Sequence, residues 1–68
     1  MKSKVWLSVR WPDGTETVEK VYPSTAAIVL AWAKQTTVPV YVTVLYPTNA
    51  TKITVDCAGK IHVERGVT

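Results

Sequence analysis

The chain has few of the residues that form cross-links or bind metals. Cys57 is its only cysteine and His62 its only histidine. A single cysteine cannot form a disulfide within the chain, which argues against a secreted disulfide-rich protein and for a reducing compartment. One cysteine, one histidine and five carboxylates also cannot supply the four Cys/His ligands of the usual zinc site. We therefore expect no disulfide, no metal site and no other cofactor.

Long hydrophobic runs are missing as well. The longest covers the eight residues 26–33, whereas a membrane-spanning helix needs about 20. The first residues alternate between polar and apolar side chains and contain no secretory signal. These features predict a soluble, cytoplasmic protein that does not enter a membrane. A chain of 68 residues has room for one hydrophobic core, so we expect residues 1–68 to form a single small domain.

Neither charge nor glycine is concentrated anywhere in the sequence. Eight Lys/Arg against five Asp/Glu give a net charge of +3, which indicates only a mild preference for acidic partners. The basic residues are scattered, so the sequence has no basic tail. Gly14, Gly59 and Gly66 are isolated from one another and do not form a loop that could hold a phosphate.

Asp56, Cys57 and His62 have the side chains of a nucleophilic enzyme and lie close together in the sequence. Successive residues of a strand point to opposite faces, so Cys57 faces the core if Ile53 and Val55 do. Asp56 and His62 then lie on the other face, and the three side chains cannot act together. We interpret Cys57 as a buried structural residue and predict that the protein is not an enzyme.

An alternating pattern near the N-terminus predicts a β-hairpin. The inward residues of its first strand are Val5, Leu7, Val9 and Trp11. Asp13-Gly14 is a strong turn signal, and we predict these two residues as the loop. In that register Val9 lies opposite Val18 and Trp6 lies opposite Val21, so apolar residues meet across the pair.

The rest of the chain reads as one helix and three strands. Pro23 ends the hairpin, and Ser24 or Thr25 is predicted as the N-cap of the helix. Residues 26–34 favour a helix of about three turns, which Val38-Pro39 ends. The predicted strands are a Val-rich one over residues 38–46, a second over 52–57 and a short one from 61, with Ile61 and Val63 inward.

This element order predicts an α+β fold, with a single, mainly antiparallel β-sheet and one α-helix packed on one face. The order is strand-strand-helix-strand-strand-strand, and the helix returns the third strand to the side of the first. The spatial order is then 2-1-3-4-5, which approaches the β-grasp pattern. The strand–strand–helix–strand part resembles in outline that of small phage-encoded inhibitors of host proteins and contains no diagnostic motif.

The predicted helix has more apolar surface than one sheet can bury. Ile28, Val29 and Trp32 cluster on one side, whereas Leu30 projects about 100° or more away from them. A second possible stripe consists of Ala26, Val29, Leu30 and Ala33. Whichever stripe faces the sheet, either Leu30 or the Ile28/Trp32 pair remains outside. Flanking chain ends are one possible cover; the other is a protein partner, or a second copy of this chain in a homodimer, docked through Leu30 or Trp32.

The sheet face away from the helix is the second candidate surface. By alternation it carries Trp6, Ser8, Arg10, Thr17, Glu19, Tyr41, Thr43, Leu45, Lys52, Thr54, His62 and Glu64. Trp, Tyr and Arg dominate binding hot spots, so we predict Trp6, Arg10 and Tyr41 as the centre of a partner-binding surface, with Leu45 beside them. The same mixture suits single-stranded nucleic acid, whose bases stack on aromatic rings. An ordinary solvent-facing sheet surface is the third interpretation.

Two functional classes follow from these surfaces. The first, which we favour, is a small non-enzymatic protein-binding module, such as an inhibitor or adaptor of a host protein encoded by a phage or another mobile element. The alternative is a nucleic-acid-binding domain that uses the basic and aromatic sheet face. Glu19, Asp56 and Glu64 are predicted on that face and would repel phosphate, which favours the protein-binding class.

Overall fold

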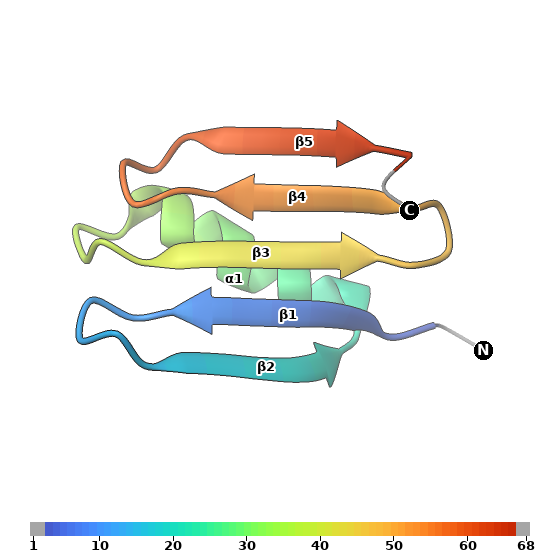
Figure 1. Cartoon of the computed structure of the whole chain (residues 1–68), viewed down its shortest axis with the longest axis horizontal. Coiled ribbons are helices and arrows are strands. Elements are labelled where there is room, and N and C mark those ends of the chain that lie inside the picture. Colours follow the sequence, from blue (N-terminus) through green and yellow to red (C-terminus); the bar gives the residue numbers. More distant parts are fainter. Residues whose placement is uncertain (1–2, 67–68) are drawn as a thin grey trace.

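Five strands and one helix follow each other in the predicted order in the computed structural model, which describes residues 3–66 (Figure 1). The elements are β1 (Val5–Arg10), β2 (Glu16–Val21), α1 (Pro23–Gln35), β3 (Tyr41–Tyr46), β4 (Thr51–Val55) and β5 (Ile61–Arg65). The strands form one sheet in the order β2-β1-β3-β4-β5, and the four neighbouring pairs are all antiparallel. The predicted α+β class and strand order are confirmed.

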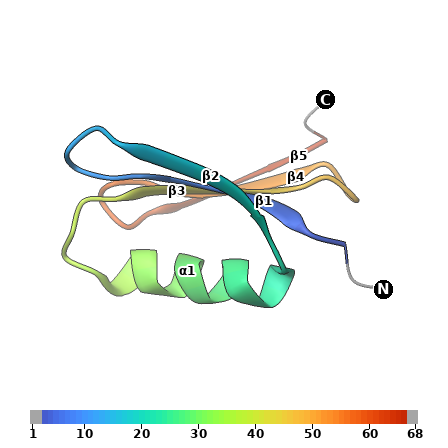
Figure 2. The same ribbon diagram turned by 90° about the horizontal axis from the view of Figure 1, so that it is seen from below.

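Helix α1 covers one face of the sheet only (Figure 2). It packs mainly on β1, β3 and β4. The buried core between the two layers consists of Val5, Leu7, Val9, Ala26, Ala33, Val40, Val42, Val44 and Val55. Ala26 and Ala33 are the buried helix residues, and their small side chains allow the helix to lie close to the valines of the sheet. The opposite face, which we call the open face, is covered by no other segment of residues 3–66.

The outer strands extend beyond the edges of the helix. Ile61 and Val63 on β5 pair with Val55 and Ile53 on β4, so they point to the helix side as the alternation predicts. Both are nevertheless exposed, because α1 does not reach across to β5. Their predicted burial is therefore wrong, although their face is right.

The first hairpin has a three-residue loop, one residue longer than predicted. The backbone N–H of Trp11 donates to the carbonyl of Thr15, at 2.8 Å, and closes the loop around Pro12, Asp13 and Gly14. Gly14 has a φ of +92°, a conformation that glycine adopts without steric cost. The carboxylate of Asp13 accepts hydrogen bonds from both the backbone N–H and the hydroxyl of Thr15. This side-chain tie favours the longer loop.

The longer loop shifts the register by one residue. Val9 lies opposite Thr17, not Val18, and Trp6 lies opposite Lys20, not Val21. The predicted register is therefore wrong. Because opposed residues share a face, every side chain of β2 lies on the face opposite to the predicted one.

Helix α1 begins earlier than predicted. Pro23 is its first residue, and Tyr22 is the N-cap, without a side-chain hydrogen bond. Proline suits this position because its φ is already helical and its missing N–H has no partner to lose there. Ser24 and Thr25 consequently lie inside the first turn, and their predicted capping role is wrong.

The third strand begins later than predicted. The Thr36 hydroxyl accepts a hydrogen bond from the backbone N–H of Val38, and the N–H of Val40 donates back to the carbonyl of Val38. These local bonds hold the segment in a turn, so β3 starts at Tyr41. Val38 is exposed as a result, whereas Val40 is fully buried.

Cys57 lies in the turn between β4 and β5 and is exposed. The strand ends at Val55, because the Asp56 carboxylate accepts hydrogen bonds from the backbone N–H groups of Ala58 and Lys60 and folds the chain into a turn. The predicted burial of Cys57 in the core is therefore wrong. The alternation that suggested it stops two residues earlier.

An exposed Cys57 makes a clear prediction. We expect Cys57→Ser to change the free energy of unfolding by less than about 0.5 kcal/mol, measured by urea denaturation. The native protein should also react with a bulky thiol reagent at the rate of an accessible thiol. Val55→Ala, a control at the fully buried neighbour, should cost about 2 kcal/mol. Protection of Cys57 from the reagent in the native state would contradict the exposed position.

Candidate binding surface

The open face of the sheet carries most of the predicted binding residues. Strand pairing places there Trp6, Ser8, Arg10, Glu16, Val18, Lys20, Tyr41, Thr43, Leu45, Lys52, Thr54, His62 and Glu64. Ten of these residues were predicted on this face. Thr17 and Glu19 were also predicted here, but the register shift moves them to the helix side. Glu16, Val18 and Lys20 of β2 take their place.

A hollow of about 320 Å³ lies near the centre of the open face. Its lining residues are Trp6, Ser8, Thr43, Leu45 and Lys52. Trp6 lies opposite Leu45, and Ser8 lies opposite Thr43 in the β1–β3 pair. The small side chains of the second pair leave room beside the large ones of the first. The structure thus brings two predicted residues, Trp6 and Leu45, into one apolar depression.

Cationic side chains lie over the aromatic rings of this face. The Lys20 Nζ is 4.9 Å from the centroid of the Trp6 ring, and the Arg10 Cζ is 6.0 Å from the centroid of Tyr41. Arg10 also pairs with Glu16, at 3.5 Å. Contacts between a cation and an aromatic ring at exposed sites contribute about 0.5–1 kcal/mol each. Trp6 and Tyr41 nevertheless remain 41% and 40% exposed.

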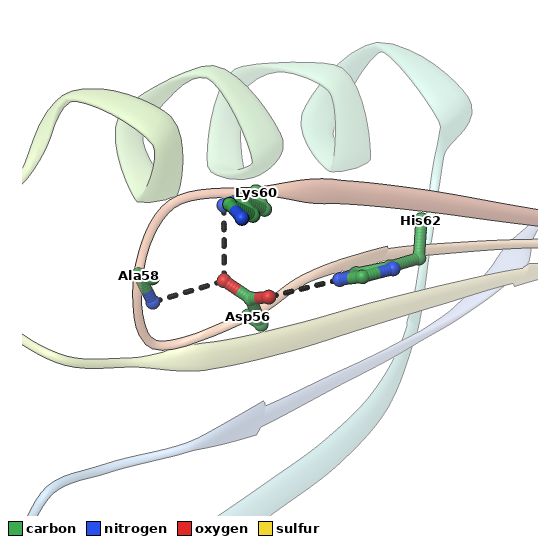
Figure 3. Close-up of polar contacts among 4 residues, drawn as sticks. All are labelled: Asp56, Ala58, Lys60 and His62. Atoms are coloured by element: carbon green, nitrogen blue, oxygen red, sulfur yellow. Dashed lines mark hydrogen bonds and ion pairs between the residues drawn. The ribbon is translucent and has the colours of Figure 1, made fainter.

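Asp56 and His62 form a hydrogen-bonded pair at the end of the open face (Figure 3). The Asp56 Oδ2 lies 2.8 Å from the His62 Nε2, while its Oδ1 accepts from the backbone N–H groups of Ala58 and Lys60 at 2.9 and 3.0 Å. In the described part of the chain, His62 has no hydrogen bond to any other side chain, Cys57 included. The pair therefore ties the β4–β5 turn together.

The charge of Asp56 is expected to stabilise the fold in a pH-dependent way. The hydrogen bond from His62, followed by that from Lys60, holds the pKa of Asp56 below its ordinary value of 3.8. A carboxylate with a lowered folded-state pKa stabilises above its unfolded pKa, and this stabilisation is lost as the pH falls through the folded pKa. We expect Asp56→Asn to be less stable than the wild type at pH ~7, and the gap to close below pH ~4. Urea denaturation at several pH values measures it, and a gap that persists unchanged at low pH would contradict it.

Leu30 and Trp32, the predicted binding residues of the helix, lie in different environments. The helix buries Ala26 and Ala33 and packs Leu30 against the core. Trp32 remains 40% exposed and Ile28 is 70% exposed. Of the two stripes that the sequence left open, the Ile28/Trp32 pair is the one outside. Both helix candidates lie on the opposite side of the sheet from Trp6.

Trp11, predicted in the core, is 37% exposed. It follows β1 on the helix side, near the edge that α1 does not cover. Its ring packs against Trp32, with the ring centroids 6.0 Å apart and the planes inclined by 52°. The residue is thus on the predicted face but at the rim of the core, where one side of the indole meets solvent.

Sequence reasoning missed Val18 and Lys20 on the open face and Glu19 on the helix side. The signal was present in Pro12-Asp13-Gly14, because a glycine in the left-handed region after a type I turn makes a three-residue hairpin loop. Within residues 3–66, no three Asp, Glu, His or Cys side chains are close enough to hold a metal ion. No helix there is long and apolar enough to cross a membrane.

Comparisons with known proteins add no relative to this description. No protein-family model, curated protein or solved structure matches the chain. Its candidate surfaces are therefore defined by its own residues alone.

Proposed function

We propose that this protein is a non-enzymatic protein-binding module, an inhibitor or adaptor that holds its partner on the open face of the sheet. The observation that carries the proposal is the apolar hollow lined by Trp6 and Leu45 on a face that no segment of residues 3–66 covers. A side chain of the partner that enters this hollow would remove the Trp6 ring from water. Buried tryptophans of this kind supply much of the free energy of protein–protein binding.

The composition of the surrounding surface supports the same proposal. Tyr41 and Arg10 lie beside each other at one end of β1 and β3, and Val18 adds an exposed apolar side chain on β2. Aromatic residues and arginine at the centre, with other charged residues around them, are typical of protein interfaces. The open face thus has the anchor, the apolar patch and the polar rim that a protein partner uses.

The distribution of charge favours a protein over a nucleic acid. Arg10 is paired with Glu16, and Lys52 lies directly opposite Glu64 on the neighbouring strand. Lys20, which lies over Trp6, has the tryptophan and no acidic residue directly opposite it. A strand of phosphates gains affinity from many unopposed cations, and this face offers few.

Nucleic-acid binding is the second candidate, because two cation–ring pairs, Lys20 with Trp6 and Arg10 with Tyr41, have the chemistry that stacks bases and contacts phosphates. Fluorescence polarisation with single-stranded oligonucleotides at low and moderate salt tests it. Tight binding that weakens steeply with salt and is lost in Trp6→Ala would replace the protein-binding proposal with this one.

The protein-binding proposal is tested by affinity capture from host lysate with three baits: the wild type, Trp6→Ala and Trp32→Ala. The two tryptophans are a matched pair, since they are 41% and 40% exposed on opposite sides of the sheet. A protein captured by the wild type and by Trp32→Ala, but not by Trp6→Ala, supports the open face as the binding surface. A protein lost from Trp32→Ala alone would assign the binding surface to the helix side.

A further inference from the structure

A crevice of about 300 Å³ opens on the helix side of the molecule, between β2 and α1. It exists because α1 packs mainly on β1, β3 and β4 and leaves Thr17 and Glu19 on the inner side of β2 exposed. Leu7 and Val9 of β1 form part of its lining, and Trp11 and Trp32 line it as well. The three-residue hairpin loop places Thr17 and Glu19 in the same lining, opposite Val9 and Leu7. We call this site the tryptophan crevice.

Two indole rings meet in the crevice at an open angle. The centroids of Trp11 and Trp32 are 6.0 Å apart and their planes are inclined by 52°. Each ring is partly exposed, at 37% and 40%. The face of an indole attracts cations electrostatically, and tryptophan does so most strongly among the aromatic residues. Both indoles line the crevice, so a cation bound there would lie next to two such side chains.

Glu19 is the one ionisable side chain in the lining of the crevice. Within residues 3–66 it forms no ion pair with a lysine, an arginine or the histidine. Its neighbour Lys20 points to the open face, where it lies over Trp6, and so does not neutralise it. The crevice thus combines an unpaired carboxylate with two indole rings and an aliphatic floor, on a protein whose net charge is positive.

We propose that the tryptophan crevice binds a quaternary ammonium group. Such a group spreads its charge over methyl groups, so it loses less hydration than a primary ammonium when it contacts aromatic rings and aliphatic side chains. The carboxylate of Glu19 supplies the opposite charge. This inference is independent of the proposed function, because the crevice lies on the other side of the sheet from the open face and shares no lining residue with its hollow.

The site can be tested by NMR titration with tetramethylammonium chloride, at constant ionic strength. The chain has three tryptophans, whose indole N–H signals report on the two surfaces separately. We expect saturable shifts for Trp11 and Trp32 with a dissociation constant on the order of 1 mM, and no shift for Trp6. Equal shifts of all three signals, or no saturation up to ~100 mM, would overturn the proposal.

A neutral compound of the same shape, 3,3-dimethyl-1-butanol, separates cation binding from simple apolar contact. The isostere should bind at least about fivefold more weakly than choline, its charged counterpart. Glu19→Gln should weaken choline binding by about fivefold and leave the isostere unaffected. Glu64→Gln, which removes a carboxylate from the open face, is the matched control and should change neither. Equal affinity for the two compounds would show an apolar crevice without cation recognition.

A third set of binding measurements distinguishes two sources of the quaternary ammonium group. A short peptide with one trimethyllysine, compared with its unmethylated form, represents a partner's side chain, whereas choline represents a free small molecule. Tighter binding of the methylated peptide than of choline assigns the site to a protein partner; equal binding assigns it to the small molecule. Tighter binding of the unmethylated peptide would overturn the proposal. Trp6→Ala should leave all of these affinities unchanged, so failure here and failure of the proposed function are separate outcomes.

Discussion

Replacing Trp6 by alanine is expected to weaken binding of the open-face partner by at least ~2 kcal/mol, about thirtyfold, while the fold remains intact. The indole is the largest side chain in the lining of the central hollow, and under the proposed function its exposed 41% would become buried against the partner. A rim charge such as Glu64 remains in water and contributes much less. The loss is therefore concentrated in this one residue, and isothermal titration calorimetry with the captured partner measures it.

Trp32→Ala serves as the matched control in this measurement, with almost the same exposed fraction. It should leave the affinity for the open-face partner unchanged. A thermal melt of each variant separates lost binding from lost folding. If Trp6→Ala unfolds the protein, the assignment of its side chain to the solvent-facing side of β1 is wrong.

Trp11→Ala is expected to have the larger effect on stability, about 2–3 kcal/mol in the free energy of unfolding. Complete removal of a buried tryptophan costs about 3–5 kcal/mol, and the reduction reflects the 37% of Trp11 that is already exposed. The substitution also removes the ring that packs against Trp32, at 6.0 Å between centroids. Urea denaturation monitored by circular dichroism provides the measurement.

A double-mutant cycle isolates the contribution of the contact between the two rings. Trp11→Ala, Trp32→Ala and the double variant should give a coupling free energy of about 0.5–1.5 kcal/mol, as for other aromatic pairs. Additive effects would mean that the rings do not stabilise each other. A cost for Trp11→Ala no larger than that for Trp6→Ala would contradict its placement at the rim of the core.

The strand order could be predicted because several local patterns agree. Val5, Leu7 and Val9 alternate with polar residues, and the valines of the third strand repeat the same period of two. A helix of about three turns between the second and third strands leaves one simple way to cover the apolar face of the sheet. The face of each β1 and β3 residue follows directly from this alternation, which is why Trp6, Arg10, Tyr41 and Leu45 lie where they were expected.

Three of the failures share a physical origin, because a local hydrogen bond or a proline overrides the pattern of residue types. The exposure of Ile61 and Val63 has another cause, since α1 does not reach across to β5. Asp13 ties the first loop to Thr15 and shifts the register, and Asp56 ties the last turn to two backbone N–H groups and moves Cys57 out of the strand. Pro23 begins the helix without a side-chain cap. Aspartate side chains that bond to their own backbone carry no periodicity, so alternation cannot detect them.

Which β2 residues lie on the open face depended on one of these local interactions, the bonding of Asp13 to Thr15 in the first loop. The open face kept its aromatic residues, since they lie on β1 and β3. A one-residue shift, however, replaced Thr17 and Glu19 of β2 by Glu16, Val18 and Lys20. The same shift brings Glu19 into the tryptophan crevice. The residues that an outer strand contributes to a surface can therefore be predicted from the sequence only if the length of the loop that sets the register of that strand is predicted correctly.

The pairing of β1 with β3 has a consequence for the rate of folding. The β1–β2, β3–β4 and β4–β5 pairs each join strands that are consecutive in the chain, so each can form by closing a short loop. The β1–β3 pair alone joins strands separated by β2 and α1. The entropy cost of long-range closure is thus concentrated in this ladder. We expect the transition state to be reached when a preformed β1–β2 hairpin docks on the β3–β5 meander, and substitutions along the β1–β3 ladder to slow folding more than substitutions in any of the turns.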